Sequence, residues 1–580
     1  MALKVLSALD VAKTQYYHFK AIMIAGMGLF SDSYDLFCIP SIMRMIGRIY
    51  YPEVDRTVKE RYWFEVPTAI ASTMIAVALM GTVIGQLVFG RLGDRVGRRY
   101  VYGVSLVMMV AGSIGCGFSL SRLTSMVFVS LGFFRFLLGI GIGGDYPLSA
   151  TIMSEFANKR TRGAFIAGVF TMQGFGILLS SLVTMIVCSI FEACAGDLIS
   201  PSKLPQSENV SPVPPESDLA WRLILMIGAI PASMTYYWRM KMPETARFTA
   251  LVERNTLQAA NDMEKVLNVS LSSIQEDIEM MNTPNTRAAL SNTYSFFSRE
   301  FLRRHGRDLF AASFNWFLVD IVFYSLNLFQ YYTFKGLLAS KSNMNLYDDA
   351  WQVAKLQTIV AVSATIPGYF ATVYMIDKVG RVMIQATGFF FMAVSLFTVA
   401  KVNDGGWTSN PGAEFMILYG LTLFFSNFGP NTTTFIVPAE LFPARFRATC
   451  HGISGAVGKV GAIIGTVGYI WASRDPPHGL GVSNTFAAMG GVCVLGFFAT
   501  YFFTRETMGR SLEENENVDE FTGVWFLRFW PNKFWAIRIE TNTGLRLTAI
   551  VENSSETLIS SSPEESPRNG FSRFDNPESV

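Results

Sequence analysis

The chain has 580 residues, of which 50% are hydrophobic and only 16% are charged, whereas about a quarter of the residues of a soluble domain are charged. The composition therefore excludes a soluble globular protein and indicates one that crosses a membrane several times. The net charge of +2 is small and gives no indication of a nucleic-acid partner.

Runs of about 20 apolar residues, the length that crosses roughly 30 Å of hydrocarbon, follow one another along the chain. Twelve lie near 21–43, 67–90, 100–120, 125–150, 163–190, 221–240, 310–333, 353–375, 382–401, 414–438, 450–472 and 485–503. We therefore expect an all-α membrane protein with twelve transmembrane helices in two six-helix halves, 1–240 and 308–515. A polar cytoplasmic linker, 241–307, joins the halves, an external loop covers 191–219, and a largely disordered tail follows at 516–580.

Short basic loops set the expected orientation, because cytoplasmic loops carry an excess of Lys and Arg. RLGDRVGRR (91–99), NKRTR (158–162), DKVGR (377–381) and ARFR (444–447) all fall on the side of the linker if the helices alternate. The first apolar run lacks a small-residue cleavage site and is too long for a signal peptide. We therefore expect it to remain as a spanning helix, with both termini in the cytoplasm.

The two halves repeat each other at a nearly constant offset. Asp94-Arg-Val-Gly97-Arg98 matches Asp377-Lys-Val-Gly380-Arg381, and Glu155 matches Glu440. Two such halves around a long cytoplasmic loop indicate an alternating-access transporter with its site at their interface. We expect the repeated charges to pair at the cytoplasmic ends and to hold one conformation closed. This gate set is Asp94, Arg95, Arg98, Glu155, Arg162, Asp377, Arg381, Glu440 and Arg447.

Ionisable residues inside the apolar runs are costly and are usually functional. The runs contain Asp32, Asp35, Arg135, Asp145, Asp320 and Lys459. Four acids and two bases suit a protein that holds an anion while it carries protons. Without the anion, we expect neighbouring carboxylates to neutralise Lys459 and Arg135, because an unpaired buried charge is expensive.

The run near 310–333 carries a polar stripe. Trp316, Asp320 and Tyr324 are spaced i, i+4 and i+8, which puts them on one helix face, and Asn327 lies close to it. An aromatic stripe that only packs is the alternative interpretation, but a carboxylate in its middle argues against it. We expect this face to line the transport cavity.

Donor side chains beside small residues complete the expected site. Gln173, Asn431 and Lys459 each have glycine neighbours, and small residues leave room between helices. Together with Trp316 and Tyr146 they are hydrogen-bond donors, which suits a compact oxyanion. An ionised Asp320 can only accept, so it tolerates an anion that carries O–H groups, as phosphate does and sulfate at neutral pH does not.

The segment GGDYPLSATIMSE (143–155) interrupts an apolar run with glycines, Asp145, Tyr146 and Pro147. In the repeat it falls opposite Gly429-Pro430-Asn431. We therefore expect a broken-helix step at the same depth in each half, with the helix thinned and bent at the cavity.

Several motifs resemble known families. GRLGDRVGRR (90–99) and RFLLG (135–139) resemble the major facilitator superfamily, and PETARF (243–248) with RETMGRSLEE (505–514) resembles its sugar-porter-like branch. The longer stretches around residues 9–39, 143–178, 315–330 and 424–465 resemble the plant and fungal inorganic phosphate:proton symporter family. These stretches are most similar to the sequences of the plant high-affinity phosphate transporters, and the similarity runs from about residue 5 to residue 515.

The resemblance implies that the chain imports inorganic phosphate by symport with protons across the plasma membrane. The phosphate ligands it implies are Tyr146, Gln173, Trp316, Asp320, Tyr324, Asn431 and Lys459. It implies that Asp35 and Asp145 carry protons, with Arg135 and Asp320 coupled to them. In our hypothesis, external protonation releases Arg135 from Asp35 and Asp145, phosphate bridges Lys459 and Asp320 across the halves, and inward opening deprotonates the acids.

Two other functions stay open on the sequence: a transporter of another solute, such as a sugar or organic anion, and a receptor that binds phosphate without moving it. Arsenate is a second candidate substrate. The sequence has no P-loop, no Ser/His/Asp arrangement and no metal-ligand spacing, so we expect no enzyme, cofactor or metal. The six cysteines are expected to pack in the core, with Cys188 and Cys194 the only candidate disulfide. In the tail, Ser562 and Ser566 are candidate targets of a regulatory kinase or trafficking factor. Asn209 is a candidate glycosylation site.

Overall fold

The computed structural model describes residues 16–51, 66–121, 123–195, 216–253, 294–334, 345–404, 413–474, 478–516, 536–537 and 549–550, together with 214, 255 and 258. The chain forms two units, Met1–Glu520 and Phe521–Val580. In the second unit the described residues are two short strands, β1 (Ala536–Ile537) and β2 (Ala549–Ile550), which pair antiparallel. The sequence did not predict these strands.

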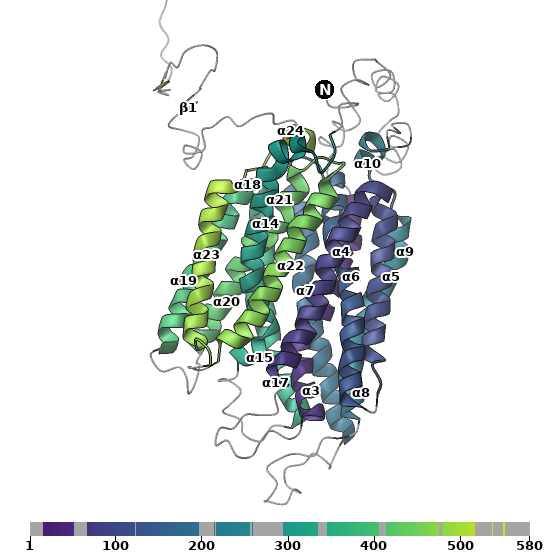
Figure 1. The fold of residues 1–580 in the computed structure, drawn as a ribbon, viewed down its shortest axis with the longest axis vertical. Coiled ribbons are helices and arrows are strands. Elements are labelled where there is room, and N and C mark those ends of the chain that lie inside the picture. Colours follow the sequence, from purple (N-terminus) through teal and green to yellow (C-terminus); the bar gives the residue numbers. More distant parts are fainter. Residues whose placement is uncertain are drawn as a thin grey trace, which may run out of the picture. The chain divides into compact units, whose positions relative to one another are not determined.

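The first half of the large unit consists of helices that follow the predicted apolar runs (Figure 1). They are α2 (Tyr16–Phe37), α3 (Ile39–Tyr50), α4 (Thr68–Val96), α5 (Arg98–Gly117), α6 (Thr124–Phe156), α7 (Arg162–Ala195), α8 (Ser217–Ile227) and α9 (Ala229–Lys241). The pairs α2/α3 and α8/α9 each form one continuous span. The short α10 (Ala246–Leu251) follows within the predicted linker.

The second half repeats this arrangement and begins with a long helix. Its elements are α14 (Arg299–Leu328), α15 (Gln330–Thr333), α17 (Leu346–Val360), the π-helical turn η4 (Ala361–Thr365), α18 (Ile366–Val379), α19 (Arg381–Asp404), α20 (Ala413–Asn427), α21 (Pro430–Leu441), α22 (Arg447–Ala472), α23 (Val482–Phe503) and α24 (Leu512–Glu516). The helices α17, η4 and α18 run together as one span.

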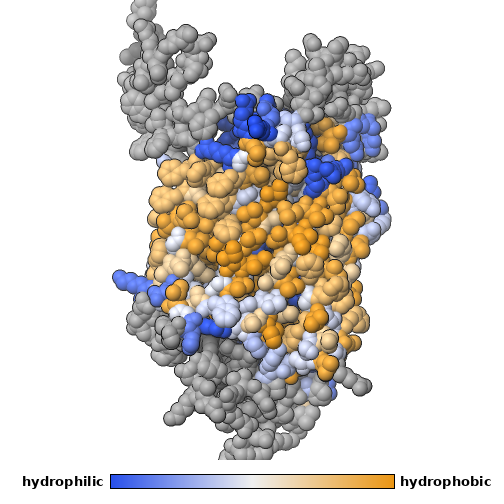
Figure 2. All heavy atoms as spheres, viewed as in Figure 1, coloured by the Kyte–Doolittle hydropathy of each residue, from blue (hydrophilic) through white to orange (hydrophobic). Residues whose placement is uncertain are grey.

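Eleven helical segments in the described ranges are long and apolar enough to cross a membrane. The remaining predicted run, 414–438, is divided between α20 and α21, each of which is too short to be counted alone. The two together complete the predicted twelve. Figure 2 shows the matching surface, a broad apolar band between two polar ends.

Glycines of α6 bring it against α4. A Cβ atom on Gly139 would lie 2.0 Å from the Ala78 carbonyl oxygen, and one on Gly143 would lie 2.4 Å from that of Thr82. The predicted thinning of this helix is therefore confirmed. The predicted break is wrong for the first half, because α6 continues through Pro147 to Phe156. Only the second half has the broken step, between α20 and α21.

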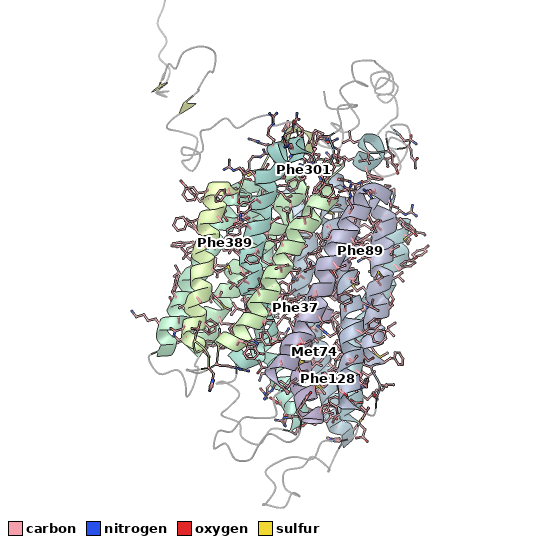
Figure 3. All side chains as sticks on the ribbon, viewed as in Figure 1. Phe37, Met74, Phe89, Phe128, Phe301 and Phe389 are labelled. Carbon is pink, nitrogen blue, oxygen red and sulfur yellow. The ribbon has the colours of Figure 1, made fainter. Side chains whose placement is uncertain are left out.

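The large unit has two polar ends (Figure 2), which we name after the elements that Figure 1 shows there. The α10/α24 end also carries the start of α14, where Phe301 packs with Phe442 and Phe446. Phe128, on α6, lies toward the opposite, α3/α17 end (Figure 3).

Candidate functional site

A buried ion pair stands at the centre of the site. Lys459 Nζ on α22 donates to Asp320 Oδ2 on α14 at 2.8 Å, and both side chains are 1% exposed. The predicted neutralisation of Lys459 by a carboxylate is confirmed. The prediction that these two residues face each other across the halves is wrong, because both helices belong to the second half.

Aromatic rings from both halves surround the ammonium. Lys459 Nζ lies 4.4 Å from the ring centroid of Tyr324 on α14 and 4.9 Å from that of Tyr146 on α6. These are cation–π distances. Gly458 lets Trp316 approach, since a Cβ atom at Gly458 would lie 2.6 Å from the indole Cδ1. Asp320, Trp316 and Tyr324 therefore lie on one side of α14, as predicted, and this side faces α22. That it lines a transport cavity stays a prediction.

The two predicted amide ligands are joined by a tyrosine. The Tyr369 hydroxyl on α18 donates to Gln173 Oε1 on α7 at 2.8 Å and accepts from Asn431 Nδ2 on α21 at 3.0 Å. Phe170 packs edge-on against both Tyr369 and Tyr146, with ring centroids 5.8 and 6.4 Å apart. Phe170 thus connects the amide group with the rings around Lys459.

All seven predicted phosphate ligands are buried, and the structure brings them together in these two adjoining groups. Tyr369 is a member that the sequence analysis missed. It has no charge, but Gly368 beside it approaches the Phe424 carbonyl oxygen so closely that a Cβ atom would lie 2.5 Å away. A polar residue next to a close-packed glycine was the same signal that identified Gln173 and Lys459.

Asp145 is paired with an arginine that the sequence analysis also missed. Arg239 on α9 donates to Asp145 Oδ1 at 2.9 Å and to Oδ2 at 2.8 Å, and both side chains are fully buried. Ser105 donates to Oδ1 at 3.2 Å, and the Arg239 guanidinium lies 3.9 Å from the centroid of the Tyr102 ring. The hypothesis that Asp145 holds Arg135 is therefore wrong.

The other buried charges are less fully bonded. Asp35 Oδ1 accepts from Ser113 Oγ at 3.2 Å, and its Oδ2 has no partner among the described residues. Arg135 donates from Nε to the Met74 carbonyl at 3.1 Å, and it acts on Asp35 electrostatically, without a hydrogen bond. Both oxygens of Asp32 are buried without a partner in the described part of the chain. Asp35 and Asp32 are the acids that can gain a proton without losing an ion pair.

At the α10/α24 end, each half closes on the other through a helix N-terminus. Asp94 of α4 accepts from the backbone N–H groups of Ala448 and Thr449 at 3.2 and 2.7 Å, at the start of α22. Asp377 of α18 accepts from those of Gly163 and Ala164 at 3.1 and 2.8 Å, at the start of α7. A carboxylate is favourable there because the first N–H groups of a helix have no partner of their own.

Of the remaining gate charges, Arg98, Arg381 and Arg447 form ion pairs with Glu155 or Glu440, as expected. Glu155 Oε1 accepts from Arg98 at 3.2 Å and from Arg447 of the second half at 2.9 Å. Arg381 binds Glu440 and Asp377, and Arg162 donates to the Arg510 carbonyl at 3.1 Å. Arg95 is exposed, and the structure gives it no ion pair with another described residue.

The two sugar-porter-like motifs contribute glutamates that the sequence analysis did not assign. Glu244 accepts from the N–H of Arg99 at the start of α5, and Glu506 from those of Arg381 and Val382 at the start of α19. Burial raises the pKa of Glu244, and the backbone N–H groups of Thr245 and Arg99 oppose the rise. The same end is crossed by α24, where Glu513 binds Arg247 of α10 at 3.0 Å. Burial raises the pKa of Glu513, but Arg247 outweighs it and the net shift is downward.

The α3/α17 end is closed as well. Arg44 and Arg48 of α3 bind Asp349 of α17 at 2.8 and 3.3 Å. Gln357 of α17 donates to the Phe37 carbonyl at 3.0 Å. The halves therefore meet above and below the central site, and the conformation is occluded.

The remaining predictions concern the thiols, metals and modification sites. All six cysteines are free thiols, so Cys188 and Cys194 do not form a disulfide. The described residues contain no group of three metal-binding side chains. Asn209, Ser562 and Ser566 lie outside the described ranges.

Comparison with known proteins places this arrangement in a family. The family described as "Sugar (and other) transporter" matches residues 20–518. "Probable inorganic phosphate transporter 1-9" of Arabidopsis thaliana is 59% identical over 526 residues, which cover 89% of this chain and 96% of that protein. "Probable inorganic phosphate transporter 1-10" of Oryza sativa subsp. japonica is 53% identical and covers 88% of this chain and 92% of its own length.

A similar fold occurs among solved structures. The major facilitator superfamily proton:xylose symporter XylE, solved with 6-bromo-6-deoxy-D-glucose bound, superposes with a TM-score of 0.63 at 18% identity. The superposed region covers 86% of this chain and 98% of the XylE chain. At that identity the similarity shows the fold alone, which is the predicted twelve-helix arrangement. The chain therefore belongs to the sugar (and other) transporter family of the major facilitator superfamily, and within it to the plant inorganic phosphate transporters.

Proposed function

We propose that this chain imports inorganic phosphate together with protons by alternating access. The observation that carries the proposal is the buried ammonium of Lys459 with its single carboxylate partner. Asp320 neutralises it through Oδ2, while Oδ1 has no partner among the described residues. Such a pair can receive an anion on the ammonium and a P–O–H group on the free carboxylate oxygen.

The two halves supply different parts of the proposed binding site. Tyr146 and Gln173 come from the first half, whereas Trp316, Tyr324 and Asn431 come from the second with the ion pair. Because ligands from both halves contact one anion, its binding favours the state in which the halves are closed around it. The contacts that close both ends of the bundle support a state in which the halves close around the bound anion.

Proton coupling follows from the membrane potential. Moving one charge across 100 mV changes its free energy by about 2.3 kcal/mol. A negative interior opposes entry of a monoanion, so uptake driven by the potential needs more than one proton per phosphate. Asp35 is the better placed carrier because its Oδ2 lacks a partner, whereas protonation of Asp145 must first separate it from Arg239. We propose that Asp145 exchanges a proton only when that pair opens.

We further propose the plasma membrane as the location, with the α10/α24 end and both termini in the cytoplasm. The basic loops at that end support the orientation. The proposed division is a first half (1–240), a linker (241–307), a second half (308–515) and a tail (516–580). We propose transport rather than catalysis as the activity. Arsenate and a regulatory protein at the tail remain proposed partners.

The test is uptake of labelled phosphate by transporter-deficient cells, measured against external pH with and without an uncoupler. Wild-type uptake should rise as the external pH falls and should collapse with the uncoupler. Lys459→Ala should abolish it at unchanged surface expression, while Lys355→Ala, which removes an exposed ammonium, should not. Asp35→Asn should flatten the pH dependence.

Unchanged uptake in Lys459→Ala would contradict the proposed site. Phosphate binding without uptake by the wild type would favour a receptor. Strong inhibition of labelled phosphate uptake by glucose or organic anions would favour a transporter of another solute.

A further inference from the structure

Tyr369 fixes the orientation of the two amides in the central site. Its hydroxyl has a single hydrogen, which it donates to Gln173 Oε1 at 2.8 Å. The same oxygen accepts from Asn431 Nδ2 at 3.0 Å. Tyr369 is 0% exposed, so bulk water does not compete for these bonds. The carbonyl oxygen of one amide and the nitrogen of the other must therefore point toward the tyrosine.

The second hydrogen of the Asn431 amide is also committed. Asn431 Nδ2 donates to Asn427 Oδ1 at 2.8 Å, and an amide nitrogen has only two hydrogens to give. Asn431 Oδ1 and Gln173 Nε2 make no hydrogen bond within the described part of the chain. Gln173 can thus offer a ligand donors, while Asn431 can offer it an acceptor.

We propose that Tyr369 is a positioning residue that makes the central site selective for a tetrahedral anion carrying a hydroxyl group, an inference that rests on the proposed phosphate transport. The Gln173 Nε2 donates to an unprotonated oxygen of the anion. The Asn431 Oδ1 accepts the hydrogen of its hydroxyl. The sequence analysis expected Asn431 to donate to the anion, whereas in this proposal its side chain accepts.

This arrangement discriminates by mismatch. Sulfate at neutral pH has the size and shape of phosphate but no hydroxyl, so its oxygens would face the lone pairs of Asn431 Oδ1. A site with a committed acceptor rejects an analogue that lacks the matching hydrogen, because the buried acceptor is then left unpaired. The unpartnered Oδ1 of Asp320 adds a second acceptor of the same kind.

The chain of bonds also joins the two halves. Gln173 belongs to α7 of the first half, and Tyr369, Asn427 and Asn431 belong to the second. The Gln173 end of this chain can therefore form only when the halves are closed on each other. The Asn427–Asn431–Tyr369 part lies within one half and keeps its orientation when the halves separate.

The test compares Tyr369→Phe with wild type in the uptake assay, with sulfate as the competing anion. Loss of the hydroxyl frees the Asn431 amide to rotate and present its nitrogen. The KM for phosphate should rise about tenfold, the concentration of sulfate that inhibits by half should fall about tenfold, and the maximal rate should stay near that of wild type. Asn427→Leu, which removes the second anchor of Asn431, should change selectivity in the same direction.

Tyr419→Phe is the matched control, since its buried hydroxyl donates to the Leu326 carbonyl at 2.7 Å and has no contact with the amides. It should keep the wild-type KM and sulfate sensitivity. If Tyr369→Phe reaches the surface and keeps both, the inference is overturned. If Tyr369→Phe fails to fold, unchanged selectivity in Asn427→Leu overturns it. Absence of phosphate uptake by the wild type would instead overturn the proposed function.

Discussion

The Asp145–Arg239 pair allows a quantitative prediction. Both side chains are 0% exposed, and two parallel hydrogen bonds of 2.9 and 2.8 Å join them. Asp145→Asn keeps the shape of the side chain but leaves the guanidinium charge buried without a counter-ion. Breaking a buried pair from one side costs about 3–5 kcal/mol. We expect this variant to unfold several degrees below wild type in detergent, as followed by intrinsic tryptophan fluorescence.

The double variant Asp145→Asn with Arg239→Gln provides the decisive comparison. It removes both charges, so it should recover most of the stability lost in the single variant. Glu300→Gln is the control, because its pair with Arg304 is more than a third exposed on both sides and solvent-exposed ion pairs contribute little to stability. A double variant less stable than both single variants would refute the assignment of the cost to an uncompensated charge.

Three further predictions concern the gate and the packing. Asp94→Asn should increase the hydrogen-exchange rates of the Ala448 and Thr449 amides at least about tenfold, whereas Asp377→Asn should do so for Gly163 and Ala164; equal effects of both variants at both helices would contradict the assigned contacts. Since the pKa of Glu513 lies below its ordinary value of 4.5, the stability it contributes is fully present above that pH and is lost as the pH falls through the lowered value. The hydrogen-exchange protection of the α24 amides, corrected for the intrinsic exchange rate, should therefore stay constant from about pH 7 to about pH 5. Glu513→Gln should lower that protection. A loss of protection already near about pH 6 would contradict a lowered pKa of Glu513. Gly139→Val should prevent folding because its Cβ would lie 2.0 Å from the Ala78 carbonyl oxygen, whereas Gly491→Ala, with nothing within 4 Å, should be tolerated; equal yields of folded protein would refute this packing argument.

The spans and the gate could be predicted because their signals are local. Apolar run length determines a spanning helix, and the repeat of Asp94 at Asp377 identifies the two halves of the gate. The stripe of Trp316, Asp320 and Tyr324 was predictable for the same reason, since spacing alone puts the three on one face.

Partners across the fold were not predictable in this way. Arg239 lies at the end of the run near 221–240 and resembles an ordinary interfacial arginine in sequence, so Asp145 was assigned to Arg135 on its own helix. Tyr369 has no charge to single it out among the 21 tyrosines. In both cases the choice of partner depends on how α9 and α18 pack against helices far away in the chain.

The position of the gate contacts determines how the transport cycle can use them. The bonds from Asp94 and Asp377 cross from one half to the other, so they must separate whenever that end opens. Both contacts lie at the polar α10/α24 end. When they separate, water can hydrate the carboxylates and the helix N–H groups. The open and closed conformations of this end therefore stay close in free energy. The Asp145–Arg239 and Asp320–Lys459 pairs each lie within one half, so opening of that end does not by itself separate them. The protein can thus break and re-form the Asp94 and Asp377 contacts at low cost in free energy. The two buried ion pairs move as part of the half that contains them.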